Sequence, residues 1–275
     1  GAPIPNRHGQ RVPIVQHEDV RRMLLGLKAG SEAMRALLAY LAFHMDVGQH
    51  DPNPDARLAA MNRVEILTPL VKAYTTDLGY MLCRDAIQVL GGSGYCSDYP
   101  VEQYARDIKI LSIWEGTNYI QALDLVGRKL GLDHGNAFKT WISEVMSFAQ
   151  SNGSDADFGA DFTLLQKAAG MVADFAQRFM KYFQEGRASL VPMYATRFLD
   201  CFAETVLANL LLEQALIARG KLAELNAGSA DGLFYQGKLA SAKFFCRNIL
   251  PNVFGRHAAL TLEDLSALEV PEEAI

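Results

Sequence analysis

The sequence predicts an all-α protein built as an antiparallel helical bundle followed by a second helical bundle. Apolar residues recur at steps of three and four over most of the chain, which is the period of an amphipathic helix. No stretch alternates apolar and polar residues over a useful strand length, and no internal repeat is present. Half of the 275 residues are hydrophobic and 21% are charged, so the chain can bury a sizeable core.

The first bundle is expected over residues 1–131. Its helices follow the apolar periodicity and are expected at residues 18–45, 56–90, 101–110 and 118–130. Pro52 and Pro54 end the first helix, because proline cannot continue a helical hydrogen-bond ladder. Pro69 predicts a kink inside the second helix, which the glycines at 91–94 then end.

The second bundle is expected over residues 132–275. Its helices follow a polar, glycine-containing stretch at 131–136, which is the candidate boundary. Its helices are expected at residues 138–149, 161–183, 190–225 and 233–250. The connectors between them are rich in small and polar residues, as loops are. The tail from Pro251 is expected to be partly ordered, and each bundle is expected to have its own core.

The composition disfavours several classes of function. There are 26 Lys and Arg against 31 Asp and Glu, and a net charge of −5 does not attract nucleic acid. The four cysteines show no CxxC spacing and the six histidines no HExxH motif, so we expect no metal site. Neither a signal peptide nor a membrane-spanning run is evident. We therefore expect reduced thiols and a location in the bacterial cytoplasm or an organelle matrix.

Glu115 lies between two predicted helices, at a turn marked by Gly116. Thr117 and Asn118 are residue types that favour a helix N-cap. A carboxylate at such a helix entrance can point into a cleft, and a glycine lets another group approach its backbone closely. Trp114 can exclude water, which makes a neighbouring carboxylate a stronger base. From these residues alone, a catalytic base and a capping turn with an exposed glutamate remain the two alternatives.

A second unusual stretch, residues 88–95, places three glycines after a predicted helix. It fits neither GxGxxG nor GxxxxGK[ST], and it follows a helix rather than a strand, which disfavours a Rossmann or P-loop phosphate site. The glycines either stop the helix in a tight loop or let a ligand approach the backbone, with Gln88 presenting its amide.

Together, the two stretches resemble the C-terminal helical domain of the acyl-CoA dehydrogenases. In that family a glutamine, a Gly-Gly-x-Gly-aromatic turn, an Arg-Asp helix and an aromatic-Glu-Gly-Thr turn follow one another at about this spacing. Here they are Gln88, residues 91–95, Arg106-Asp107 and residues 114–117. The resemblance is strong over roughly residues 10–130. Beyond them it suggests the subgroup with an extra C-terminal helical domain, which includes long-chain acyl-CoA and 3-methylmercaptopropionyl-CoA dehydrogenases.

The resemblance implies a mechanism and a set of site residues. Glu115 matches the base that removes the α-proton of an acyl-CoA thioester. The β-hydrogen leaves as hydride to FAD, and the trans-2-enoyl-CoA forms. Gly116 and Trp114 match the side of the turn that faces the substrate. FAD contacts are implied for Gln88, Gly91, Gly92, Thr117 and Tyr119.

The resemblance also implies partners and an incomplete site. The turn at 88–92 matches one that contacts the flavin of a neighbouring subunit, so a homodimer or larger assembly is expected. An acyl-CoA substrate and an electron-transfer flavoprotein are the other implied partners. Trp114 stands where a tyrosine is common, and Tyr119 where a smaller polar residue is common. The family's N-terminal helical domain and middle β-domain have no counterpart here, so we expect a C-terminal fragment with little or no dehydrogenase activity alone.

Two other functions are considered beside the enzyme. One is a non-catalytic binding module, like a DNA-binding alkylation-response relative of the family, which needs a basic C-terminal face. The basic residues available for it are Lys221, Lys238, Lys243, Arg247 and Arg256. Acidic residues lie among them in the sequence, namely Glu213, Glu224, Asp231 and Glu263. The other is an all-α scaffold without chemistry, against which the intact turn at 115–117 argues.

Overall fold

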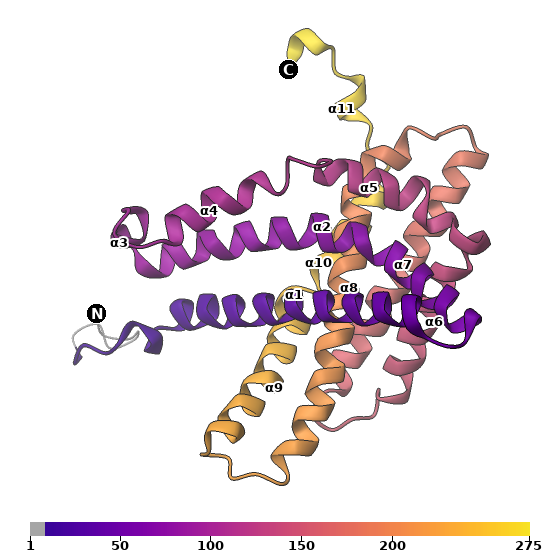
Figure 1. Cartoon of the computed structure of the whole chain (residues 1–275). Coiled ribbons are helices and arrows are strands. Elements are labelled where there is room, and N and C mark those ends of the chain that lie inside the picture. The colour runs from indigo at the N-terminus through magenta and orange to yellow at the C-terminus, as the bar shows by residue number, and fades with distance from the viewer. Residues whose placement is uncertain (1–8) are drawn as a thin grey trace.

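In a computed structural model, residues 9–275 are described, and they form helices with no strand among them (Figure 1). The all-α prediction is confirmed. The α-helices are α1 (Glu18–His50), α2 (Pro54–Leu90), α3 (Gly92–Tyr95), α4 (Val101–Ile110), α5 (Asn118–Gly127), α6 (Asn136–Ser151), α7 (Gly159–Gln184), α8 (Leu190–Leu222), α9 (Ala230–Asn248), α10 (Asn252–Thr261) and α11 (Ser266–Glu269). The short 3-10 helices are η1 (Ile14–Gln16), η2 (Lys129–Gly135) and η3 (Glu272–Ala274).

Local sequence signals account for the helix ends. Asn53 caps α2, because its side-chain oxygen accepts a hydrogen bond from the backbone N–H of Asp55 at 2.9 Å. Pro54 occupies the first helical position, where its missing N–H leaves no hydrogen bond unmade. Pro69 lies buried inside α2, which continues past it as one helix. The short helix expected at residues 101–110 has the same bounds in the structure.

Two stretches differ from the expected elements. The helix expected to reach residue 130 ends at Gly127, and the backbone of residues 133–135 takes left-handed angles inside η2. The chain beyond Pro251, expected to be only partly ordered, forms α10, whose Val253 and Leu260 are buried. The second part of the chain therefore contributes one more core helix than predicted.

The first helices form an elongated arm. α1 packs along α2, and α4 runs back along α2, so that α3 lies at the tip of the α2–α4 hairpin (Figure 1). α8 and α9 form a second hairpin that points in another direction. α5 joins the arm to the rest of the molecule, since it contacts both α2 and α8.

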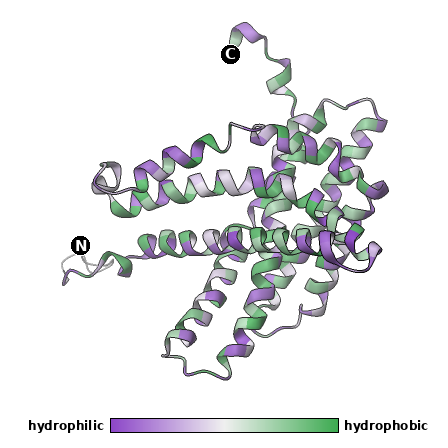
Figure 2. Cartoon of the chain, viewed as in Figure 1, coloured by the Kyte–Doolittle hydropathy of each residue, from purple (hydrophilic) through white to green (hydrophobic). Residues whose placement is uncertain are grey.

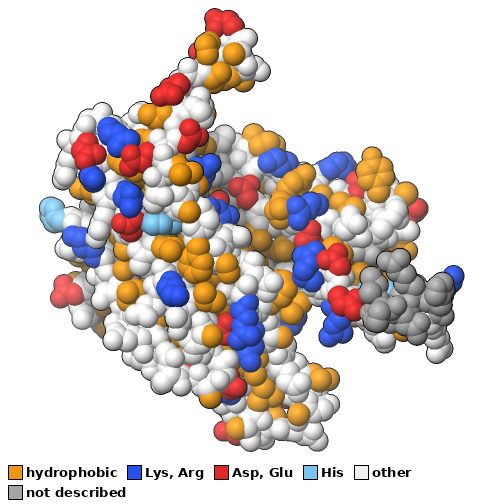
Figure 3. Space-filling view, turned by 180° about the vertical axis from the view of Figure 1, so that it is seen from behind, with side chains coloured by type: hydrophobic (Ala, Val, Ile, Leu, Met, Phe, Trp, Pro, Cys, Tyr) orange, Lys and Arg blue, Asp and Glu red, His pale blue; other side chains and the backbone are white. Residues whose placement is uncertain are grey.

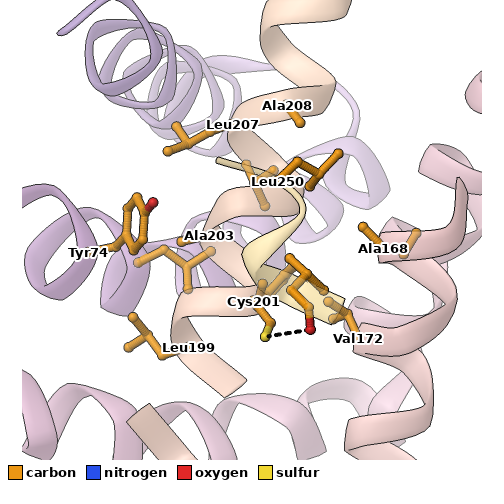
Figure 4. Close-up of a cluster of buried hydrophobic side chains, with 14 of the residues drawn as sticks. Tyr74, Ala168, Val172, Leu199, Cys201, Ala203, Leu207, Ala208 and Leu250 are labelled. Carbon is orange, nitrogen blue, oxygen red and sulfur yellow. Dashed lines mark hydrogen bonds between the residues drawn. The ribbon is translucent and has the colours of Figure 1, made fainter. Parts of the chain in front are cut away.

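α8 is the central helix of the core. Every residue from Cys201 to Leu212 is buried, and a helix that is apolar on all sides belongs in an interior. Its length and composition would also allow it to cross a membrane, but 72% of its most apolar window is buried within the protein. Green apolar segments accordingly run through the centre of the molecule in Figure 2. Figure 4 shows Tyr74, Val172 and Leu250 gathered around α8.

The buried side chains of the two expected bundles form one connected cluster rather than two separate cores. It extends from Leu37 in α1 through α8 to Leu260 in α10. The expectation of a separate core for each bundle is therefore wrong. The domain boundary at residue 131 stays a prediction, because a shared core does not locate a boundary in the chain.

A buried ionic cluster connects α2, α8 and α10. Glu204 on α8 is only 2% exposed, and its carboxylate accepts a hydrogen bond from the Arg256 guanidinium at 2.7 Å. The hydroxyl of Tyr74 on α2 donates to the same carboxylate at 3.2 Å. Asp200, one turn earlier on α8, lies 3.5 Å from Arg256. One guanidinium on α10 thus faces two carboxylates inside the core.

Burial changes the titration of both carboxylates. It raises the pKa of Glu204 to about 7 and the pKa of Asp200 to about 6, against the opposing charge of Arg256. A carboxyl whose pKa is raised by folding binds its proton more tightly in the folded state. Its contribution to stability is complete below its ordinary pKa and is lost as the pH rises through the raised value.

The Glu204→Gln variant is therefore expected to change the pH dependence of stability. The free energy of unfolding of the wild-type protein should fall, relative to that of the variant, by on the order of 1–3 kcal/mol between about pH 4.5 and pH 7. Urea unfolding across this range measures the difference. The exposed Glu273→Gln change is the control and should give no such trend. A wild-type-to-variant difference that stays constant with pH would contradict the assignment.

Candidate active site

The turn that carries Glu115 connects α4 to α5. The backbone N–H of Trp114 donates to the carbonyl of Ile110 at 3.1 Å, and the N–H of Asn118 donates to the carbonyl of Ser112 at 3.1 Å. Between these bonds, Glu115 and Gly116 have φ angles of 52° and 85°. Left-handed angles are costly for a residue with a Cβ and often occur at functional sites. The turn therefore holds Glu115 in a conformation that its own backbone does not favour.

The start of α5 holds the other side of this turn. Thr117 is the N-cap, and its hydroxyl oxygen accepts a hydrogen bond from the N–H of Ile120 at 3.3 Å. The N-cap expected from the sequence is thus present. A Cβ at Gly116 would lie at ordinary contact distance, 3.4 Å, from the Gln121 amide nitrogen, so it is the φ angle of 85° that favours glycine.

Asn118 attaches the turn to α2. Its side-chain amide donates to the carbonyl of Ala73 at 3.1 Å and to the hydroxyl of Thr76 at 3.0 Å. Its carbonyl oxygen accepts a hydrogen bond from the Lys72 ammonium at 3.0 Å. Partial burial lowers the pKa of Lys72, while the charges of Asp77 and Glu115 oppose this shift. Sequence reasoning assigned Asn118 a capping preference and missed this tertiary role, and it missed Lys72 altogether.

The Glu115 side of the turn is open to solvent. Trp114 is 52% exposed, and Glu115 and Gly116 are exposed as well. The shielding expected from Trp114 is therefore not provided by this chain. Tyr119 is 46% exposed, and its hydroxyl donates to the carbonyl of Pro192 in α8 at 3.5 Å. Several apolar side chains around the turn are exposed, namely Ile110, Leu111, Ile113 and Ile120.

The glycine turn has one structural glycine and two open ones. A Cβ at Gly94 would lie 2.7 Å from the carbonyl oxygen of Ile87, so α3 can pack on the end of α2 only with glycine there. Gly91 has φ 63°, and no atom lies within 4 Å of a Cβ at Gly91 or Gly92. Gln88 is exposed in the last turn of α2. The exposed backbone at Gly91 and Gly92 is accessible to a ligand.

The structure does not bring the two turns together. Lys72, which contacts the Glu115 turn, and Gln88, beside the glycine turn, are separated by about 24 Å along α2 at 1.5 Å per residue. Figure 1 shows α3 at the tip of the arm and the start of α5 at its base. Within one chain, the predicted residues therefore form two separate sites.

The basic residues considered for a DNA-binding face are engaged within the protein. Four of them form ion pairs with carboxylates, namely Lys221, Lys238, Arg247 and Arg256. The Lys243 ammonium lies over the Phe158 ring. Basic and acidic side chains are interspersed on the face seen in Figure 3. These contacts do not favour a nucleic-acid interface. Among residues 9–275, no group of three His, Cys, Asp or Glu side chains is placed to hold a metal ion.

Two family models together match most of the chain. Residues 4–130 match the acyl-CoA dehydrogenase C-terminal domain, and residues 141–271 match the domain described as acetyl-CoA dehydrogenase C-terminal like. The chain belongs to the acyl-CoA dehydrogenase family. The family resemblance is thereby confirmed, including the subgroup with further C-terminal sequence.

Individual members of the acyl-CoA dehydrogenase family match nearly the whole chain. It is 39% identical to a butyryl-CoA dehydrogenase of Syntrophomonas wolfei over 97% of this chain and 43% of that protein. It is 32% identical to the 3-methylmercaptopropionyl-CoA dehydrogenase of Ruegeria pomeroyi over 94% of this chain and 43% of that protein. An acyl-CoA dehydrogenase of Bacillus anthracis, solved in complex with FAD, has the same fold, with a TM-score of 0.66, 17% identity and coverage of 98% and 45%. The chain thus spans less than half the length of these relatives.

Replacing Asn118 by Ala is expected to loosen the Glu115 turn. The change leaves the Ala73 carbonyl, the Thr76 hydroxyl and the Lys72 ammonium without this partner, and it should lower the free energy of unfolding by about 1–3 kcal/mol. Chemical denaturation measures the loss. Asn252→Ala is the matched control, since the exposed Asn252 side chain makes no hydrogen bond within residues 9–275. Equal effects of the two changes would contradict the role of Asn118.

The two glycine environments predict opposite tolerances to alanine. Gly94→Ala should destabilise the protein by about 1–3 kcal/mol, because the new methyl group meets the Ile87 backbone. Gly92→Ala should change stability by less than about 0.5 kcal/mol, since its Cβ enters open space. Thermal unfolding of the two variants side by side tests this contrast. A loss in Gly92→Ala as large as that in Gly94→Ala would show that the glycine turn is structural throughout.

Proposed function

We propose that this chain supplies the catalytic base of an FAD-dependent acyl-CoA dehydrogenase. Glu115 removes the α-proton of an acyl-CoA thioester, and the product is the trans-2-enoyl-CoA. The observation that carries the proposal is the left-handed Glu115-Gly116 pair, held on one side by the Thr117 cap and on the other by Asn118. A capping turn needs no strained glutamate, whereas a base benefits from an anchored backbone that limits where its carboxylate can lie.

The chemistry requires the exposed turn to be covered. An α-proton is weakly acidic, and a carboxylate that loses contact with water becomes a stronger base. Apolar side chains such as Ile113, Trp114 and Ile120 surround the turn and offer a surface for such a cover. Gly116 leaves its backbone accessible, so a thioester can lie against it beside the Glu115 carboxylate. Trp114 contributes the apolar wall of the substrate site.

The residues proposed to contact FAD fit a group that approaches the backbone closely. Gly91 and Gly92 have open space where a Cβ would lie, and Gln88 presents an exposed amide beside them. At the other turn, the Thr117 hydroxyl accepts a bond from the helix and retains its own proton to donate, and the Tyr119 ring is half exposed. When bound, FAD accepts the hydride that leaves the β-carbon.

The separation of the two turns supports an oligomeric enzyme. The proposed base lies near one end of α4 and the proposed cofactor-contacting turn near the other, as expected if the two turns serve different flavins. We propose that residues 88–92 contact the FAD of a neighbouring copy in a homodimer or larger assembly. An electron-transfer flavoprotein is the proposed electron acceptor, and the bacterial cytoplasm or an organelle matrix is the proposed location. The remaining flavin and CoA contacts come from sequence outside this chain.

The Glu115→Gln change tests the proposal in a longer, FAD-loaded protein that contains this chain together with the remaining flavin and CoA contacts. Removing the base should lower the rate of acyl-CoA oxidation by at least about 10²–10⁴-fold, because the amide cannot accept the α-proton. The flavin absorbance of the purified variant should remain, since the amide keeps the shape of the carboxyl group. Anaerobic flavin bleaching by butyryl-CoA measures the rate.

The matched control is Glu269→Gln in the exposed α11, which should leave the rate unchanged. Residues 1–275 alone should show little or no turnover, since much of the flavin site is expected from sequence outside them. Rapid bleaching by the Glu115→Gln protein would overturn the role of Glu115. Robust turnover by residues 1–275 alone would overturn the proposed division of the site.

A further inference from the structure

A cavity of about 650 Å³ lies between the end of α5, η2, α6 and α7, away from both turns of the proposed enzyme. Val126 and Gly127 line it, about 12 Å along α5 from Asn118. Its volume lies within the range of pockets that hold small organic ligands. None of the residues assigned to the dehydrogenase reaction lines it.

The lining of this cavity is mostly apolar. Met180 and Phe183 line it and are 63% and 53% exposed, while Phe138 and Phe179 lie behind them almost completely buried. Both rings pack on Phe198 of α8, with centroid distances of 6.2 and 5.5 Å. Ala173 and Ala176 form part of the wall, and small side chains leave the space open. Exposed apolar side chains around an open space suit a flexible hydrocarbon chain.

The rim of the cavity carries one lysine. Lys139 lines it and makes no ion pair with any of residues 9–275, and His134 and Gln177 also line it. No Asp or Glu is among the lining residues. The Lys139 ammonium lies near Gly135, where a Cβ would be 4.0 Å from the nitrogen. An unpaired cation beside an apolar cavity favours a ligand with an anionic head.

The backbone at this rim is unusual. Asp133, His134 and Gly135 follow one another with φ angles of 51°, 54° and 83°. Two of these residues carry a Cβ, so the conformation has a cost that the surrounding packing must offset. This turn directs the chain from α5 into α6 and places His134 and Gly135 on the rim. The strained segment and the cavity thus coincide.

We propose that this cavity binds an amphiphile with one hydrocarbon chain and one carboxylate head. The chain lies against Met180 and Phe183, and the carboxylate meets the Lys139 ammonium at the rim. The inference does not depend on the dehydrogenase reaction, because it uses none of the residues assigned to that reaction. It gives this part of the chain a binding role of its own.

Calorimetric titration of the purified protein with decanoate tests the proposal. Decanoate should bind at one site, and Lys139→Gln should weaken its binding about tenfold, the loss of one charge-assisted contact. Decan-1-ol should bind the wild type and Lys139→Gln alike, since it lacks the charge. Lys167→Gln removes an exposed charge on α7 at a residue that does not line the cavity, so it should leave decanoate binding unchanged.

Two filling variants test the cavity itself. Ala176→Trp should abolish binding of both probes. Gly131→Phe should do the same, and a Cβ at Gly131 has no atom within 4 Å, so this variant remains usable if Ala176→Trp does not fold. The absence of decanoate binding to the wild type would overturn the proposal. Binding that survives the folded filling variant, or that responds equally to Lys139→Gln and Lys167→Gln, would overturn it as well.

Discussion

The burial of α8 on every side from Cys201 to Leu212 is the constraint on which the rest of the structure depends. A helix without a polar face must be surrounded, and no single pair of neighbours can cover its full circumference. Helices α1, α2 and α5 from the first part of the chain contact α8. Helices α7, α9 and α10 from the second part contact it as well. The two helices that hold the Glu115 turn, α2 and α5, are therefore both fixed against α8. The position of a surface turn thus depends on a helix deep in the core.

Charges inside this core fix the register of the helices around α8. Glu204 accepts from Arg256 of α10, and the fully buried Asp161 of α7 accepts two bonds of 2.8 Å from Arg247 of α9. Buried ion pairs add little net stability compared with apolar contacts, but leaving one partner alone is costly. A shift of α9 or α10 along its axis would strand a buried carboxylate. These pairs therefore select one arrangement among several that would bury similar apolar area.

Local signals explain what could be predicted from the sequence. The helical period, the Asn53 and Thr117 caps and the glycines after Leu90 act within a few residues, so the helices and the Glu115 turn were predictable. The Asn118 bonds to α2 join residues 42 to 46 apart in sequence, and no local pattern signals them. The left-handed turn at 133–135 was missed for a related reason. Gly135 favours such angles and Asp and His tolerate them better than most residues, but three in succession follow from tertiary packing that no local pattern signals.

The geometry of the arm supports the proposal that one chain serves two active sites. α4 separates the Glu115 turn from the glycine turn, and apolar side chains are exposed near both of its ends, Trp114 at one and Tyr95 at the other. The base we propose must be held to within a fraction of an ångström, and the Glu115 turn is anchored to α2 and α5 near the core. A turn that offers its backbone to a cofactor needs instead to project, and the tip of a long hairpin does this. In a symmetric assembly, the tip of each arm can then complete the site whose base its neighbour supplies.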